Sequence, residues 1–255
     1  MKKQRLVFLI LIAAVLQGCN VFMDVVRPEG SKLIDVHSVS DFNKIAISGK
    51  MSLELVNGEQ ELRIETFENV HEYIETSVRN GELIVKTRNN TAFSKDPQIT
   101  VFVTADLINR VSMSGSSNGY FANYKTNNIA IKTSGSSDTR GSLTASSIEL
   151  SSSGSSETDL QVDCTYLTNK HSGSSEYKLN GRADNYEIDC SGSSKIEAFG
   201  LETKYTTVKS SGSAKIDVTV QETLNVSISG SGRVRYKGSP QVSEKISGSG
   251  RVMPM

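Results

Sequence analysis

Acidic side chains recur at one position of a repeated motif, where they could bind a cation or act on a sugar. Asp138, Glu157 and Glu176 each follow the glycine of a Ser-Gly-Ser motif by three residues. Carboxylate oxygens are ligands for Ca²⁺, and two carboxylates that converge on a substrate can hydrolyse a glycosidic bond. These three residues are therefore candidate ligands for a metal ion or a carbohydrate.

The other copies of the motif hold mostly basic residues at this position. From the amino to the carboxyl end, the position is occupied by Asn118, Asp138, Glu157, Glu176, Lys195, Lys215, Arg233 and Arg251. If the copies lie above one another, like charges are stacked about 5 Å apart. Such a column requires water to screen it. The favoured prediction is therefore a solvated charged face.

Other catalytic signatures in the sequence are isolated. The segment Gly115-Ser116-Ser117-Asn118-Gly119 matches the nucleophile elbow, but that motif requires a strand-to-helix turn in an α/β sheet. The three histidines, His37, His71 and His171, are scattered and suggest neither a metal site nor a catalytic triad. The formal net charge of zero gives no basic footprint for nucleic acid. We predict no catalytic residue, no cofactor and no nucleic-acid partner.

The amino-terminal residues are typical of an exported lipoprotein. A basic start precedes an apolar stretch over residues 6–16, which is too short to span a bilayer as a helix. The segment Leu16-Gln17-Gly18-Cys19 then resembles a bacterial lipobox. We predict a lipoprotein signal peptide over residues 1–18 and lipid attachment at Cys19.

This anchor would place the protein in the cell envelope with the membrane as a partner. Several acyl chains on one residue hold a protein firmly at a bilayer. Asn20 after the cysteine, in place of aspartate, favours the outer membrane. Pro28 and Gly30 disfavour regular structure, so residues 19–32 are predicted to form an extended, lipidated tether.

The two remaining cysteines, Cys164 and Cys190, could form a disulfide, because export permits one. Cys190 precedes a motif glycine by two residues, whereas Cys164 follows one by ten. A disulfide needs Cα atoms within about 7 Å. The unequal positions favour two separate buried thiols over a bridge.

The Ser-Gly-Ser motif recurs eight times with steps of 20, 19, 19, 19, 20, 18 and 18 residues. A constant period near 20 residues indicates one supersecondary unit stacked on its neighbours. The motif glycines are Gly115, Gly135, Gly154, Gly173, Gly192, Gly212, Gly230 and Gly248. We expect each to form a corner that needs positive φ or a close approach of two backbones.

Apolar residues flank each corner with the spacing of a strand. Ile148 and Leu150 precede Gly154 by six and four residues, and Ile216 and Val218 follow Gly212 by the same distances. A spacing of two places these side chains on one face of a strand. Each coil is predicted as strand, corner, strand and a polar return such as residues 180–185. The fold class is all-β, a β-helix-like solenoid of about 18–20 residues per coil over residues 113–252.

The ends of this array differ from its middle. Residues 33–112 are predicted as an amino-terminal β region of longer irregular coils, with strands over 44–56, 61–66, 82–87 and 99–104. Ser48-Gly49 resembles the corner motif, so the solenoid is expected to be continuous with this region. In the last two coils Ile228 and Ile246 lie two residues before the glycine, which predicts an end variant that shields the edge.

The segments Phe42-Asn43-Lys44-Ile45-Ala46-Ile47-Ser48-Gly49 and Asn80-Gly81-Glu82-Leu83-Ile84-Val85, together with the Ser-Gly-Ser-Ser array, resemble the auto-transporter adhesin "head GIN" domain family. The resemblance covers about residues 40–252. It implies a β-helix-like fold on exported, often lipid-anchored proteins, and it transfers no catalytic residues.

Two functions remain open from the sequence. The preferred one is a membrane-anchored, non-catalytic adhesin-like module, which binds a glycan or an envelope protein or has a structural role. The alternative is a β-helix enzyme, a polysaccharide lyase or hydrolase, that uses Asp138, Glu157 and Glu176.

Overall fold

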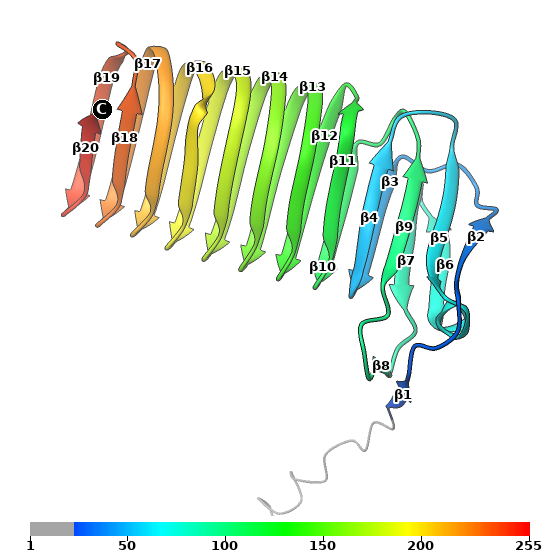
Figure 1. The fold of residues 1–255 in the computed structure, drawn as a ribbon. Coiled ribbons are helices and arrows are strands. Elements are labelled where there is room, and N and C mark those ends of the chain that lie inside the picture. The colour runs from blue at the N-terminus through cyan, green and yellow to red at the C-terminus, as the bar shows by residue number, and fades with distance from the viewer. Residues whose placement is uncertain (1–22) are drawn as a thin grey trace, which may run out of the picture.

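The computed structural model describes residues 23–255, which form one long stack of β-strands (Figure 1). The predicted signal peptide over residues 1–18 and the lipidation site Cys19 lie outside the described residues. Within the described part, no helix has the length and apolar character needed to cross a membrane.

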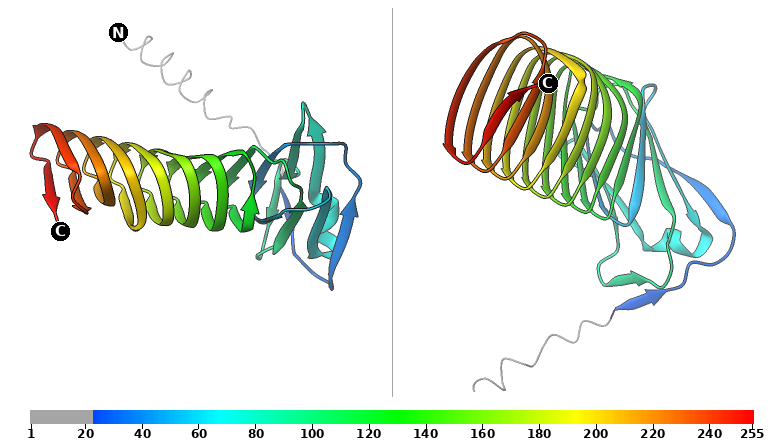
Figure 2. Two further views of the ribbon diagram at one scale, coloured as in Figure 1. Left: turned by 90° about the horizontal axis from the view of Figure 1, so that it is seen from above. Right: turned by 60° about the vertical axis from the view of Figure 1, so that its left-hand side comes forward.

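The repeat region is a β-solenoid, as its period predicts. Its strands are β10 (Arg110–Gly115), β11 (Asn118–Lys125), β12 (Asn128–Gly135), β13 (Asp138–Gly154), β14 (Glu157–Gly173), β15 (Glu176–Gly192), β16 (Lys195–Gly212), β17 (Lys215–Gly230), β18 (Arg233–Lys237), β19 (Gln241–Gly248) and β20 (Arg251–Pro254). Successive coils pair in parallel, and Figure 2 shows them stacked along one axis.

The corner glycines lie in vertical register. Gly154 is paired with Gly173, and Gly173 with Gly192. The same alignment continues to Gly248 at one end and to Gly49 at the other. The motif at Ser48-Gly49 is therefore a true first corner, and the solenoid extends into the amino-terminal region as predicted.

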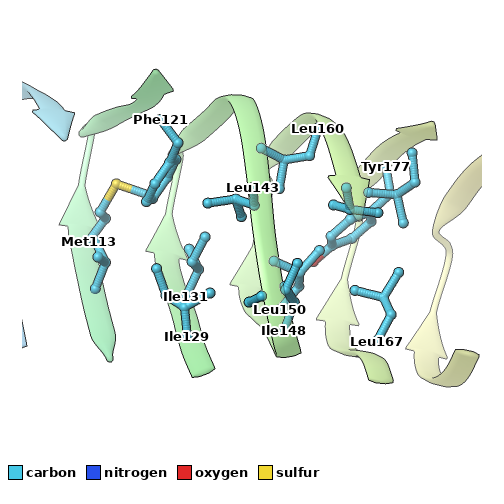
Figure 3. Close-up of a cluster of buried hydrophobic side chains, with 14 of the residues drawn as sticks. Met113, Phe121, Ile129, Ile131, Leu143, Ile148, Leu150, Leu160, Leu167 and Tyr177 are labelled. Atoms are coloured by element: carbon cyan, nitrogen blue, oxygen red, sulfur yellow. The ribbon is translucent and has the colours of Figure 1, made fainter. Parts of the chain in front are cut away.

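The core is a column of apolar side chains enclosed by the coils (Figure 3). Residues two apart along each strand point inward, so that Leu150, Leu160 and Tyr177 from successive coils pack together. Each fully buried Leu or Ile contributes about 1.5–3 kcal/mol. The alternation seen in the sequence is therefore the source of the core.

The amino-terminal strands add to one end of this stack. They are β1 (Asp24–Val26), β2 (Lys32–His37), β3 (Lys44–Gly49), β4 (Met51–Val56), β5 (Glu61–Phe67), β6 (Ile74–Arg79), β7 (Glu82–Thr87), β8 (Thr91–Phe93) and β9 (Ile99–Thr104), with a 3₁₀ helix, η1 (Glu68–Tyr73), before β6. The four strand segments predicted here are present, and the segment 44–56 is divided at the corner Gly49.

The order of the first coils in space differs from their order in the chain. Strands β7 and β9 pair in parallel with β3 and β4, on the side away from β10 and β11. Antiparallel strands then close this end, because β6 pairs with β7, and β5 with both β9 and β2. The chain therefore forms the inner coil (β3 and β4) before the outer coil (β7 and β9). It then resumes stacking on the other side of the inner coil at β10, which begins at Arg110.

Three predictions need correction. The tether does not extend to residue 32, because β1 pairs with β8 and Val26 is buried there. The polar return over 180–185 does not follow the strand but is part of it, because β15 runs through it and pairs with β14. The end variant does not seal the stack: Ile228 is buried, but Ile246 is 38% exposed, and Glu244, in register with the buried Val226, is itself exposed.

Candidate functional site

The serines on either side of each corner glycine form an outward-facing line of hydroxyl groups, here called the serine ridge. Its members are Ser114, Ser134, Ser153, Ser172, Ser191, Ser211, Ser229 and Ser247 before the glycines, and Ser116, Ser136, Ser155, Ser174, Ser193, Ser213, Ser231 and Ser249 after them. All are exposed except Ser114, which is half-buried. The strand spacing repeats the pair about every 4.8 Å.

Backbone hydrogen bonds hold this ridge in place. The N–H of the serine after each glycine donates to the carbonyl of the corner glycine one coil earlier, as from Ser174 to Gly154 (3.1 Å) and from Ser193 to Gly173 (3.1 Å). Gly173 has a φ of 109°, and a Cβ there would lie 2.5 Å from the Gly154 oxygen. Glycine is required at the corner by both the positive φ and the close backbone approach.

In the first five corners of the repeat, the residue two after the glycine is a serine buried inside the corner, whereas the last three corners have Ala214, Gly232 and Gly250 there. Ser156 and Ser175 lie in adjacent coils, and their hydroxyls are 3.1 Å apart. Ser152 accepts a hydrogen bond from the Tyr177 hydroxyl (2.6 Å) and is 3.1 Å from Ser175 Oγ. Hydroxyl–hydroxyl bonding between coils therefore occurs in the interior, whereas the ridge hydroxyls face solvent.

A shallow hollow adjoins the amino-terminal end of the ridge. It has a volume of about 390 Å³ and mostly apolar surface. Its outward-facing lining comprises Ala46, Ser48, Ile84, Ser112, Ser114, Lys132, Ser134, Ser151 and Ser153. The hollow forms because small residues occupy the position three before the corner in β3, β10 and β13, whereas later coils have Lys170, Asp189 and Lys209 there.

Lys132 is the charged group of this hollow. It is exposed, and it lies on β12 between Ser112 of β10 and Ser151 of β13. The ion pairs of residues 23–255 do not include it. An ammonium group donates up to three hydrogen bonds, so this hollow can receive a polar ligand with an acidic group. Lys132 was not among the residues predicted from the sequence, although its position three residues before Gly135 could have been recognised from the motif spacing.

The acidic candidates lie on a different face, where each has a basic neighbour. Asp138, Glu157 and Glu176 are stacked in register and exposed to solvent, as the charge argument predicts. Arg140 lies 3.9 Å from Asp138 and 3.7 Å from Glu157. Lys195 lies 2.8 Å from Glu176. Hydrogen bonds to Glu176 and then Glu197 raise the pKa of Lys195.

This arrangement is an exposed ladder of ion pairs. Between residues 23 and 255, no three His, Cys, Asp or Glu side chains are grouped closely enough to hold a metal ion. Exposed ion pairs of this kind contribute little to stability. The ladder can nevertheless keep the face hydrated and prevent unspecific pairing with other chains.

The structure separates the histidines into two environments. His37 and His71 lie near Asp35 in the amino-terminal region, and His71 Nδ1 is 3.2 Å from the Asp35 carboxylate. His171 lies inside the solenoid, 5.1 Å from the Tyr177 ring centroid. Neither ring nitrogen of His171 has a partner among the protein atoms of residues 23–255. Burial lowers the pKa of His171 to about 4.

Cys164 and Cys190 are both free and buried, which confirms the prediction of two separate thiols. Cys164 is paired across strands with Ala183, and Cys190 with Ser210. Burial raises the pKa of Cys164 to about 12 and also raises that of Cys190. Neither thiol is suited to act as a nucleophile at neutral pH.

Ser117, the central residue of the nucleophile-elbow match, is a structural corner residue. Its hydroxyl donates to the carbonyls of Gly49 (3.1 Å) and Ser114 (2.8 Å). It lies at a strand-to-strand corner with no helix after it. The match therefore has no structural context for catalysis.

The comparisons with known proteins agree with this architecture. The family model described as "Putative auto-transporter adhesin, head GIN domain" matches residues 41–240. No curated protein sequence matches the chain.

Solved structures of three other proteins share the fold. A "putative adhesin" from Parabacteroides merdae has a TM-score of 0.83 at 22% identity, covering 91% of this chain and 99% of that one. A "Putative lipid binding protein" from Parabacteroides distasonis has a TM-score of 0.84 at 22% identity, covering 91% of this chain and 100% of that one. A "putative adhesin" from Bacteroides fragilis has a TM-score of 0.71 at 21% identity, covering 90% of this chain and 100% of that one.

Proposed function

Because this chain belongs to the head GIN domain family of adhesin-like proteins, we propose that it is a lipid-anchored, non-catalytic binding module of the cell envelope. Cys19 is the proposed lipidation site, and the outer membrane is the proposed location. The ligand class that best fits the surface is a glycan with an acidic group.

The hollow beside the serine ridge is the observation that supports this ligand. Its apolar surface can pack against the C–H face of a sugar ring, while Ser112 and Ser151 can exchange hydrogen bonds with sugar hydroxyls. Lys132 can pair with a carboxylate or sulfate on the sugar. The adjoining ridge offers further hydroxyl pairs at a regular spacing, which suits an extended polymer over a compact metabolite.

A glycan array probed with the lipidated protein in detergent tests the proposal. Binding is expected for acidic glycans, and Lys132→Ala is expected to weaken it about tenfold, because a charge-assisted hydrogen bond is lost. Lys245→Ala is the matched control, since Lys245 occupies the same position before a corner at the other end of the stack. Equal binding by both variants would contradict the proposed site.

A second pair of variants tests the shape of the hollow. Ser112→Phe should fill it and abolish binding, whereas Ser227→Phe, at the same coil position in β17, should bind normally.

Turnover in the same samples tests the enzyme alternative. Products that form with the wild type but not with the triple variant Asp138→Ala, Glu157→Ala, Glu176→Ala would show a polysaccharide-cleaving activity and contradict the binding proposal. The binding proposal expects no products and a folded triple variant, because all three side chains are exposed.

A further inference from the structure

The exposed aliphatic side chains of the protein are concentrated in its first described residues. Between residues 23 and 255, the large aliphatic side chains classed as exposed are Met23, Val25, Leu33, Ile34, Val36, Val56, Leu107, Ile246 and Met255. Five of these nine lie between positions 23 and 36. The solenoid coils from 110 to 237 expose only tyrosines among their large apolar residues, at positions 120, 166 and 205. Scattered exposed apolar residues are ordinary, but such a concentration indicates a contact surface.

Two strands present these side chains. Met23 (58% exposed) and Val25 (69%) flank Asp24 at the start of β1. Ile34 (54%) and Val36 (67%) project from the same face of β2, whose only strand partner within residues 23–255 is β5. Both strands lie at the end of the molecule opposite β20 (Figures 1 and 2). An exposed apolar edge strand is usually covered by something.

The length of the chain before β1 indicates what covers it. Four residue steps separate Cys19 from Met23, and at about 3.4 Å per residue they span at most about 14 Å. Because β1 is fixed to β8 and does not belong to a free tether, an acylated Cys19 would hold this end of the molecule within reach of the lipid headgroups.

Charge gives no reason to place another partner there. This segment carries three acidic residues, Asp24, Glu29 and Asp35, and two basic residues, Arg27 and Lys32, so its net charge is small. Attraction to an acidic or basic macromolecule is therefore weak. Apolar insertion at a membrane interface needs no net charge.

We propose that β1 and β2 form a membrane-docking surface, in which Met23, Val25, Ile34 and Val36 insert into the interface of the bilayer that holds the lipid anchor. The solenoid then projects away from the bilayer, with its hollow and ridge fixed in orientation. The choice of the bilayer as the partner of this surface rests on the proposed lipid anchor at Cys19.

The protein contains no tryptophan, so a single introduced tryptophan reports its own environment. Val36→Trp and Val25→Trp, each in the full chain in zwitterionic vesicles that contain brominated phospholipid, test the two strands separately. Tyr166→Trp is the control, because Tyr166 is 57% exposed on the solenoid. Circular dichroism checks that each variant is folded.

We expect bromolipid to reduce the fluorescence of both strand variants at least about twofold, as for side chains at the acyl boundary, and to leave the control unchanged. Mass spectrometry of the amino-terminal peptide measures acylation in the same samples. Acylated protein without quenching would overturn the docking surface and leave the anchor intact. Quenching without acylation would support docking and refute the anchor, and the absence of both would refute the two proposals together.

Discussion

The solenoid coils after Arg110 and the strands before Thr104 build one continuous stack by two kinds of pairing. In the coils, each strand pairs in parallel with the strand about one period away, and the corner glycines and serines repeat the same hydrogen bonds. In the amino-terminal region, β5 and β6 pair antiparallel with neighbours at irregular separations. Uniform repetition makes successive coils nearly identical, whereas the irregular region closes the stack and can present other surfaces.

The largest expected difference between the two regions concerns their glycines. Gly173→Ala should destabilise the protein by about 2–5 kcal/mol, because a Cβ at positive φ would also overlap the Gly154 oxygen. Gly30→Ala is the matched change in the amino-terminal region. Its φ is 90°, but its Cβ would meet Glu68 only at 3.5 Å, so the loss should be about 1–2 kcal/mol. Urea unfolding followed by circular dichroism measures both, and equal losses would contradict the backbone-overlap argument.

Acid should destabilise the solenoid through His171. Its pKa is about 4 in the folded protein and 6.5 when unfolded, so between these values only the unfolded state takes up a proton. Stability should therefore fall as the pH drops from about 6.5 to 4, by about 3 kcal/mol in total. His171→Met should remove this dependence and leave stability at pH 7 nearly unchanged, because the ring nitrogens have no protein partner. A wild-type pH dependence in the variant would assign the effect to other groups.

His37 is the comparison in the amino-terminal region. Burial lowers the pKa of His37, while Asp35 opposes the shift. Stability should therefore also fall with acid through His37, and His37→Met should weaken that dependence when urea unfolding is followed across pH.

The attachment of β1 should be weaker than that of any coil. Val26→Ser removes a buried side chain of the β1–β8 pair and should cost about 1–2 kcal/mol locally. Hydrogen exchange should become faster at Thr91–Phe93 and remain unchanged in β14 and β15. Faster exchange throughout the stack would show that β1 is part of the cooperative core.

The smallest effects are expected for the exposed ion pairs of both regions. Lys195→Met removes the partner of Glu176 in the coils, and Lys86→Met removes the partner of Glu75 in the amino-terminal region. Neither change should measurably shift the urea midpoint, because water and salt screen such pairs. A clear loss at Lys195 alone would mean that the charged ladder helps to hold the coils together.

The architecture of the repeat follows from the spacing of its residues alone. Eight evenly spaced glycines with apolar residues four and six positions away allow essentially one register, so the solenoid, its corners and the separate thiols were predictable. Strands over 61–66, 82–87 and 99–104 were also evident, because alternation is a local signal.

How the irregular parts combine depends on long-range pairing that no local pattern predicts. The position of β7 and β9 outside β3 and β4, and the pairing of β1 with β8, join segments with no repeat between them. The sequence also left open which serines face solvent, since both arrangements suit a small polar residue; in the structure the two serines beside the corner glycine face outward, and the next serine, where one is present, is buried. The hollow at Lys132 depends on neighbours that come from separate coils, so its shape follows from the stacked register and from no single segment.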